Sequence, residues 1–156
     1  MLRVTKLTDY ATLVMTALAD GPESMLSAAG LAERAGLELP TVSKVLKPLA
    51  HAGLVEAFRG SAGGYRLARP ADAISLIEIV EAIEGPLGVT ECSGAHSACT
   101  LESHCGVRGN WRHINQMVAD ALRGISLAQM RGASPAGPAG NARPARRAIP
   151  VQLAAD

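Results

Sequence analysis

Residues 27–50 read SAAGLAERAGLELPTVSKVLKPLA, and this stretch decides the fold. From about Ser27 to Ala35 the pattern predicts a short helix with Leu31 facing inward, and Gly36 is placed to end it. Residues 37–39 then make a turn, and Pro40 suits the first position of a second helix. Two short helices joined by a tight turn are typical of a helix-turn-helix.

The second helix of this pair has two different faces. Its apolar face carries Val42, Val45, Leu46 and Leu49. Its outer face is polar and basic and carries Thr41, Ser43, Lys44 and Lys47. We therefore predict a recognition helix whose outer face contacts DNA. Pro48 predicts a bend or an early end, because proline removes a backbone hydrogen bond.

A β-hairpin is expected directly after the recognition helix. Strand-like residues 54–58 and 65–67 flank the glycine-rich segment RGSAGG at 59–64. The predicted DNA contacts of this wing are Arg59, Ser61 and Arg66. A short helix pair alone also fits a generic small helical domain. A helix-turn-helix followed by a wing in this order favours DNA binding.

Two more helices complete the expected DNA-binding domain, residues 1–86. One begins with Thr8 as N-cap and Asp9 in its first turn, and it ends at Gly21. The other begins at the capping-box pattern of Ser75 and Glu78. Only 3% of the residues are aromatic, so the core should be aliphatic. The fold class predicted is mainly α, a winged helix-turn-helix with further segments behind it.

The chain has three cysteines, Cys92, Cys99 and Cys105, all within an expected loop at 87–106. Their odd number and the lack of a signal-like N-terminus favour reduced thiols in a cytoplasmic protein. No apolar run approaches the roughly 18 residues that a membrane span needs. The loop therefore predicts metal or redox chemistry rather than disulfides.

Several chemistries fit three thiols on a loop. An iron–sulfur cluster suits soft thiolate ligands at wide spacing. A structural zinc site normally shows a closer cysteine pair, although His96, His104 or His113 could complete a tetrahedron. The other interpretations are a cluster-free thiol switch beside Arg108 and incidental thiols. Enzymatic use is not expected, because no general base is fixed beside a cysteine and no phosphate-cradling loop is present.

A longer helix is expected at residues 107–130. Its apolar stripe comprises Trp111, Ile114, Val118, Leu122 and Ile125. Because this helix trails a compact domain, its stripe should pack on a second subunit and form a homodimer. Residues 131–156 are rich in Ala, Gly, Pro and Arg, which predicts a disordered tail.

The order of motifs resembles a known family. The matching stretches are KLTDYA at 6–11, GLV at 53–55, RGSAGGYRL at 59–67, IVEAIEG at 79–85, RGNW at 108–111 and LAQM at 127–130. Together with the cysteine loop they resemble the winged-helix iron–sulfur regulators, which include the IscR-type, NsrR-type and SUF-system proteins. The opening motif and RGNW look most like the SUF-system branch.

The resemblance implies a 2Fe-2S or 4Fe-4S cluster on Cys92, Cys99 and Cys105. The first two cysteines are separated by six residues instead of the family's five, and Arg108 stands where the IscR type has a histidine ligand. The NsrR type completes its site with a partner's aspartate at the place of Asp9, so Asp9 is the expected fourth ligand. A plain helix-start carboxylate is the other interpretation of Asp9.

The expected function follows from the same resemblance. It implies a homodimer that binds a double-stranded DNA operator and represses an iron–sulfur assembly (SUF) operon according to cluster occupancy. The alternatives are a nitric oxide or redox sensor of the same fold, or a cluster-free thiol-switch or zinc-binding regulator.

Overall fold

The computed structural model describes residues 4–21, 25–60, 63–91, 93 and 105–131. The predicted site residues Ser61, Cys92 and Cys99 and the expected tail from residue 132 lie outside these ranges. The elements are α1 (Lys6–Ala19), α2 (Ala28–Ala35), α3 (Leu39–His51), β1 (Val55–Phe58), β2 (Gly64–Leu67), the short 3₁₀ helix η1 (Ala71–Ala73), α4 (Leu76–Glu84), α5 (Arg108–Arg123) and α6 (Leu127–Met130).

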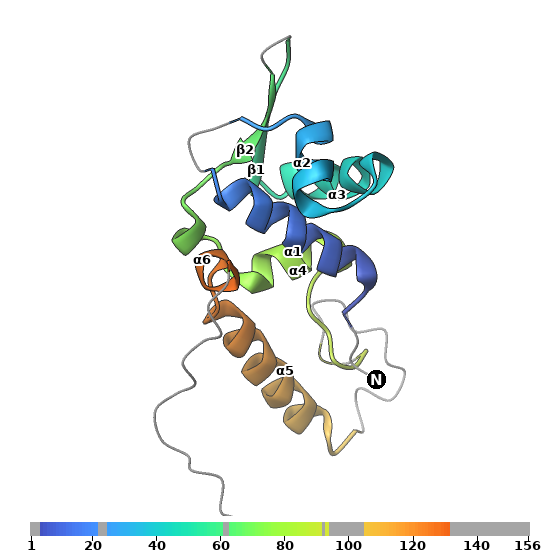
Figure 1. Ribbon diagram of the computed structural model, residues 1–156. Helices are drawn as coiled ribbons and strands as arrows, with labels where there is room; N and C mark the ends of the chain where they lie inside the picture. The colour runs from blue at the N-terminus through green and yellow to red at the C-terminus, as the bar shows by residue number, and fades with distance from the viewer. Residues whose placement is uncertain (1–3, 22–24, 61–62, 92, 94–104, 132–156) are drawn as a thin grey trace, which may run out of the picture.

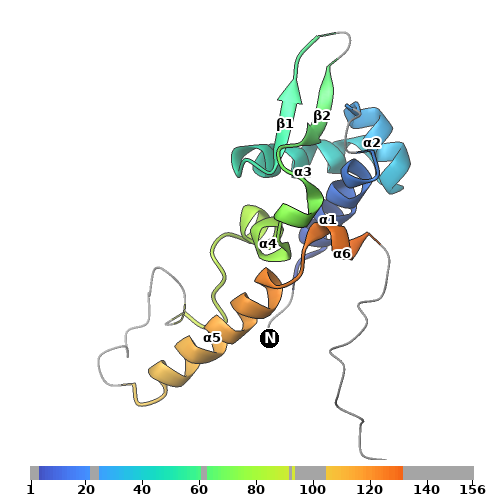
Figure 2. The same ribbon diagram turned by 90° about the vertical axis from the view of Figure 1, so that its left-hand side faces the viewer.

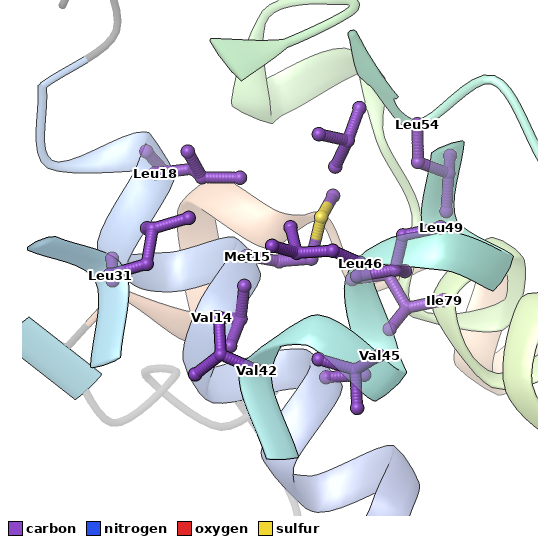
Figure 3. Close-up of a cluster of buried hydrophobic side chains, with 14 of the residues drawn as sticks. Val14, Met15, Leu18, Leu31, Val42, Val45, Leu46, Leu49, Leu54 and Ile79 are labelled. Carbon is purple, nitrogen blue, oxygen red and sulfur yellow. The ribbon is translucent and has the colours of Figure 1, made fainter. Parts of the chain in front are cut away.

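The predicted fold class is confirmed: the described chain is mainly helical, with one two-stranded antiparallel sheet. Helices α2 and α3 pack on α1, and the buried side chains between them are aliphatic or methionine (Figure 3). Val14 and Met15 of α1, Leu31 of α2 and Val42 of α3 are each 0% exposed. Each such side chain contributes about 1.5–3 kcal/mol when fully buried.

The local signals of the helix-turn-helix are confirmed. The Ser27 hydroxyl accepts the Gly30 N–H at 3.1 Å and caps α2. Gly36 ends α2 in the left-handed conformation with φ 65°, which costs glycine little because it has no Cβ. The turn then leads into α3, whose first turn contains Pro40.

The early end predicted at Pro48 is wrong, because α3 continues to His51, whereas the alternative expectation of a bend stays a prediction. Leu49, which follows the proline, is 0% exposed and holds the last turn of α3 against the core. The packing of this side chain outweighs the hydrogen bond that proline removes.

Helix α1 begins earlier than its sequence signal indicates. Thr5 is its N-cap and Lys6 its first residue, whereas the predicted cap Thr8 lies inside the helix and is 1% exposed. The Thr8 hydroxyl donates to a carboxylate oxygen of Glu84, at the end of α4. The Thr8 hydroxyl therefore bonds to Glu84, a residue distant in sequence, instead of capping α1 as predicted.

The capping box that starts α4 is confirmed. The Glu78 carboxylate accepts the Ser75 N–H at 2.9 Å and the Ser75 hydroxyl at 2.8 Å. This helix packs against α1, α3 and α5. It therefore links the helix-turn-helix to the region that follows the cysteine loop.

The segment expected as one helix at 107–130 is divided in two. Helix α5 ends at Arg123, and the chain turns at Gly124 before the short α6. The turn lets the Leu76 N–H donate to the Ile125 carbonyl at 2.8 Å. Leu127 is 0% exposed and joins the core.

The wing and α5 lie at opposite ends of the molecule (Figures 1 and 2). The wing rises beside α2 and α3, whereas α5 extends away from the other helices. Within the described ranges, no helix is both long enough and apolar enough to cross a membrane.

Candidate functional site

The outer face of α3 presents the predicted recognition residues to solvent. Ser43, Lys44 and Lys47 are exposed, and Thr41 is half-buried near the start of the helix. The opposite face is buried in the core, which fixes the rotation of α3 about its axis. The helix thus offers two lysine charges and two hydroxyls on a rigid surface, a composition that suits a DNA groove.

The wing is a hairpin with a fixed register. Glu56 pairs with Arg66 and Phe58 with Gly64 across the two strands. At the tip, the Gly63 N–H donates to the Gly60 carbonyl at 3.0 Å. A Cβ on Gly63 would meet the Phe58 carbonyl oxygen at 2.3 Å, so the tight tip requires glycine there.

A backbone bridge fixes the wing to the helix-turn-helix, and sequence reasoning missed it. Leu26 and Tyr65 exchange two backbone hydrogen bonds of 3.0 and 2.8 Å. A Cβ on Gly64 would meet the Leu26 carbonyl oxygen at 2.7 Å, so the close approach depends on this glycine. One residue shows no strand periodicity, which is why the pattern alone did not indicate the bridge.

The two wing arginines differ in their surroundings. Arg59 is exposed at the tip. Arg66 contacts the Glu56 carboxylate at 2.8 Å and lies 4.7 Å from the centroid of the Phe58 ring. This acidic partner was not anticipated, although the cross-strand register offers it. Arg66 is therefore held by partners on the hairpin itself.

The described part of the cysteine loop is fastened to α5 at both of its ends. Cys105 is half-buried and lies just before α5, where its carbonyl accepts the Arg108 N–H at 3.3 Å. At the other end, Asn115 of α5 accepts the Val89 N–H at 2.9 Å and donates to the Leu87 carbonyl at 3.3 Å. Asn115 lies seven positions after Arg108, or about 10 Å along the helix axis.

Thr90 and Ser93 are joined by side-chain hydrogen bonds. The Ser93 hydroxyl accepts the Thr90 N–H at 2.9 Å and donates to the Thr90 carbonyl at 2.9 Å. Cys92 and Cys99, and the alternative ligands His96 and His104, lie outside the described residues.

Asp9 is exposed on α1 and lies at the edge of a cavity of about 430 Å³. The cavity is bordered by the first turns of α1 and by Leu76, Val80, Leu122 and Met130. The carboxylate is thus accessible from outside the subunit. His113, another alternative ligand, is exposed on α5.

Glu84 forms a contact near Asp9 that the sequence did not indicate. One of its oxygens accepts the Thr5 hydroxyl at 2.5 Å, the Thr5 N–H at 3.2 Å and the Thr8 hydroxyl. The hydrogen bonds from Thr5 and then Thr8 hold the pKa of Glu84 below its ordinary value. The carboxylate ties the end of α4 to the turn of α1 that precedes Asp9.

A family model matches most of the chain. The model of the Rrf2 family, described as iron-dependent transcriptional regulators, matches residues 4–132. This chain belongs to the Rrf2 family. The match takes in the helix-turn-helix, the wing and α5.

Two curated relatives of this Rrf2 chain are similar over most of their length. The protein aau3 of Rhizobium meliloti (strain 1021) is 33% identical over 135 residues, which cover 86% of this chain and 88% of that protein. The HTH-type transcriptional regulator IscR of Erwinia tasmaniensis is 30% identical over 129 residues, covering 80% and 78%.

Solved structures place the Rrf2 chain in the same fold. CymR (YrzC), the global cysteine regulator of B. subtilis, gives a TM-score of 0.65 at 26% identity and covers 84% of this chain and 97% of that chain. IscR of T. potens gives 0.62 at 29% identity, covering 83% and 85%. The chain is therefore a winged-helix transcriptional regulator of the Rrf2 family, a class that binds DNA and is generally not enzymatic.

The description of the Rrf2 family as iron-dependent implies that its members use iron. Within the part of the chain that the structure describes, no three His, Cys, Asp or Glu side chains gather as metal ligands. Cys92 and Cys99 lie outside that part. Three thiols remain a fitting donor set, because iron–sulfur clusters take soft thiolate ligands. The fit to a cluster rests on this donor chemistry and on the anchoring of the loop to α5.

Proposed function

We propose that this Rrf2 regulator is a cytoplasmic homodimer that represses an iron–sulfur assembly (SUF) operon, with operator affinity set by cluster occupancy. The observation that carries the proposal is the three-thiol loop, whose described ends are both fixed on the outlying helix α5. A group held by this loop therefore acts directly on the helix that we assign to dimerisation. The motif resemblance and the iron-dependent family description support the cluster.

The proposed cluster ligands are Cys92, Cys99 and Cys105, with Asp9 from the partner subunit. When bound, a cluster supplies a redox-sensitive crosslink among its ligands. The protein residues do the rest: Asn115 and the turn at Thr90 present the loop, and the exposed carboxylate of Asp9 faces outward.

Dimerisation is assigned to the exposed apolar side of α5. Val107 is 53% exposed, Trp111 37%, Ile114 40% and Met117 59%. These residues recur every three or four positions and share one side of the helix. Val118 and Leu122, from the stripe expected in sequence, are only half-exposed. An exposed apolar helix side of this kind is typical of a subunit interface.

DNA contact is assigned to the outer face of α3 and to the wing. On α3 the proposed contacts are Thr41, Ser43, Lys44 and Lys47. On the wing they are Arg59, Ser61 and Arg66. Each subunit would place one α3 in a major groove, so the dimer geometry sets the distance between the two half-sites.

A thiol-switch regulator is the second candidate, and the structural neighbours favour it specifically. They include the cysteine regulator of B. subtilis and an oxidised form of CymR from Staphylococcus aureus, the latter with a TM-score of 0.62 at 25% identity. Under that reading Cys105 and its neighbours would respond to oxidation without iron. A nitric oxide or redox sensor with a cluster and a zinc-binding regulator are the remaining alternatives.

Anaerobic purification of the full chain separates these candidates. The cluster proposal predicts visible absorbance with iron and acid-labile sulfide in comparable amounts. Colourless protein without metal, whose operator binding changes on reversible thiol oxidation, would replace the proposal with the thiol switch. Colourless protein with stoichiometric zinc would replace it with the zinc regulator. Exposing loaded protein to nitric oxide or oxygen then identifies the signal.

A further inference from the structure

A single side chain fastens the chain before Cys92 to the middle of α5. Asn115 Oδ1 accepts the Val89 N–H at 2.9 Å, and Asn115 Nδ2 donates to the Leu87 carbonyl at 3.3 Å. The amide group supplies one acceptor and one donor to two backbone groups that need opposite partners. Because Asn115 is half-buried, these bonds are partly shielded from water.

The other attachment of α5 lies beyond its C-terminal end. There, Ile125 accepts from Leu76 at 2.8 Å, Leu127 donates to Ile74 at 2.8 Å, and both partners lie at the start of α4. Asn115 instead attaches α5 to the chain that follows the end of α4. The two attachments are about 12 to 15 Å apart along α5, and two points on a stiff helix fix its direction.

Packing between the two attachments is thin. Ala119, at 7% exposed, is the only buried residue of α5, and Val118 and Leu122 are half-buried. Small or half-buried side chains constrain the tilt of a helix less than a large core side chain does. The direction of α5 relative to α4 therefore depends strongly on the Asn115 contacts.

The same contacts lie close to the thiols. Val89 is three residues before Cys92, and the turn closed by Thr90 and Ser93 spans that interval. The Asn115 contacts therefore fix the described chain that leads into the first cysteine. Cys105 leads into the opposite end of the helical segment that carries Asn115.

We propose that Asn115 is a positioning residue that makes the cysteine loop and α5 move as one unit. The state of the thiols then sets the direction of α5 and, through the dimer, the spacing of the two recognition helices. The coupling is reciprocal, so operator DNA also favours one state of the loop. This inference rests on the proposed cluster-dependent function, and it adds the residue through which the loop acts.

The first test measures the contact itself in full-length, reduced, metal-free protein. Asn115→Ala should speed amide hydrogen exchange at Val89 roughly tenfold, the effect expected for losing a structural hydrogen bond. Gln116→Ala, on the neighbouring exposed position of α5, should leave Val89 at the wild-type rate. Equal exchange at Val89 in the Asn115→Ala variant and the wild type would overturn the proposal.

The second test measures coupling as the ratio of operator Kd values for metal-free and cluster-loaded protein. Asn115→Ala should move this ratio toward one, while Gln116→Ala keeps the wild-type ratio. Asn115→Asp preserves the shape and the acceptor for Val89 but loses the donor to Leu87, so its ratio should be intermediate. Wild-type ratios in both Asn115 variants overturn the proposal. This includes the case in which a variant changes the metal-free Kd and the cluster-loaded Kd by the same factor.

The cluster-dependent function and the positioning role of Asn115 can be disproved separately. If wild-type protein binds operator equally with and without a cluster, the proposed function is wrong and the coupling falls with it, whatever Val89 shows. If the wild-type ratio is large and the Asn115→Ala ratio is equally large, the cluster-dependent function stands and the positioning role of Asn115 is wrong.

Discussion

Glu84 joins two helices through one carboxylate oxygen. It accepts hydrogen bonds from Thr5 and Thr8, the residues that begin α1, although it belongs to the last turn of α4. A carboxylate at a helix N-terminus is favoured by unsatisfied backbone N–H groups and by the helix dipole. This contact explains why α1 begins before the threonine that local sequence marked as its cap.

Acid should remove the contribution of this contact. The hydrogen bonds from Thr5 and Thr8 hold the pKa of Glu84 below its ordinary value. The stabilisation is therefore complete above the pKa of the unfolded chain and is lost as pH falls through the folded pKa. Urea unfolding of metal-free protein should show wild type more stable than Glu84→Gln at neutral pH, with the difference shrinking as the pH falls below about 4.

The comparison needs a fixed protein concentration, because association stabilises folded chains by mass action. A gap between wild type and Glu84→Gln that stays constant from neutral pH to acid would show that the Glu84 charge is not what stabilises the contact.

The second prediction for single residues concerns the basic side chains of α3 and the wing. Lys44→Ala and Arg59→Ala should each weaken operator binding by roughly 1–3 kcal/mol where the side chain reads a base edge. A phosphate contact should instead weaken all sequences alike and lower the salt dependence of binding. Fluorescence anisotropy with operator and unrelated DNA over a range of salt separates the two.

Arg123→Ala is the matched control for these charges. Arg123 is exposed at the C-terminal end of α5, and its guanidinium forms a surface ion pair with Asp120 at 2.5 Å. Wild-type operator affinity in the Lys44→Ala and Arg59→Ala variants alike would exclude α3 and the wing from the DNA interface.

Among the elements, those predicted correctly carry their signals locally. The Ser27 cap, the Gly36 stop and the capping box of Ser75 with Glu78 lie within a few residues of the helix ends that they set. Strand periodicity around a glycine-rich tip likewise predicted the wing. The outer face of α3 followed from helical spacing alone.

The features that sequence missed depend on distant partners. Leu26 forms an isolated β-bridge to the wing only because Tyr65 lies beside it. Asn115 showed no pattern in sequence, since its two partners come from the chain before the cysteine loop. The break in the expected C-terminal helix follows from the backbone bond between Leu76 and Ile125. Such contacts exist only once the chain has folded.

Helix α5 is the element whose role is most directly testable. Ile114→Asp would place an unpaired charge in the middle of the proposed interface, so subunits should separate and operator affinity should fall together. Sedimentation velocity and operator titration measure the two effects. Gln116→Asp introduces the same residue on the polar side of α5 and should remain a dimer. A dimeric Ile114→Asp protein would remove this side of α5 from the interface.

At the scale of the whole molecule, the proposed site belongs to the dimer rather than to one chain. Asp9 is exposed on α1, whereas Cys105 lies at the start of the outlying helix α5. A carboxylate is a harder donor than thiolate for iron, so Asp9→Ala should leave the thiols able to hold a cluster but shorten its retention.

Mixed dimers test whether Asp9 acts across the interface. Asp9→Ala chains keep all three cysteines, and Cys99→Ala chains keep the aspartate. If Asp9 serves the partner's loop, a heterodimer of the two contains one intact site, and its long-lived visible absorbance per dimer should be about half that of wild type. If Asp9 serves its own loop, the heterodimer contains none. Tagged heterodimers purified anaerobically, with each parent homodimer as control, give the measurement. Absorbance no more stable than in the two parents would contradict ligation across the interface, and substitution of His113 would then test that side chain as the fourth ligand.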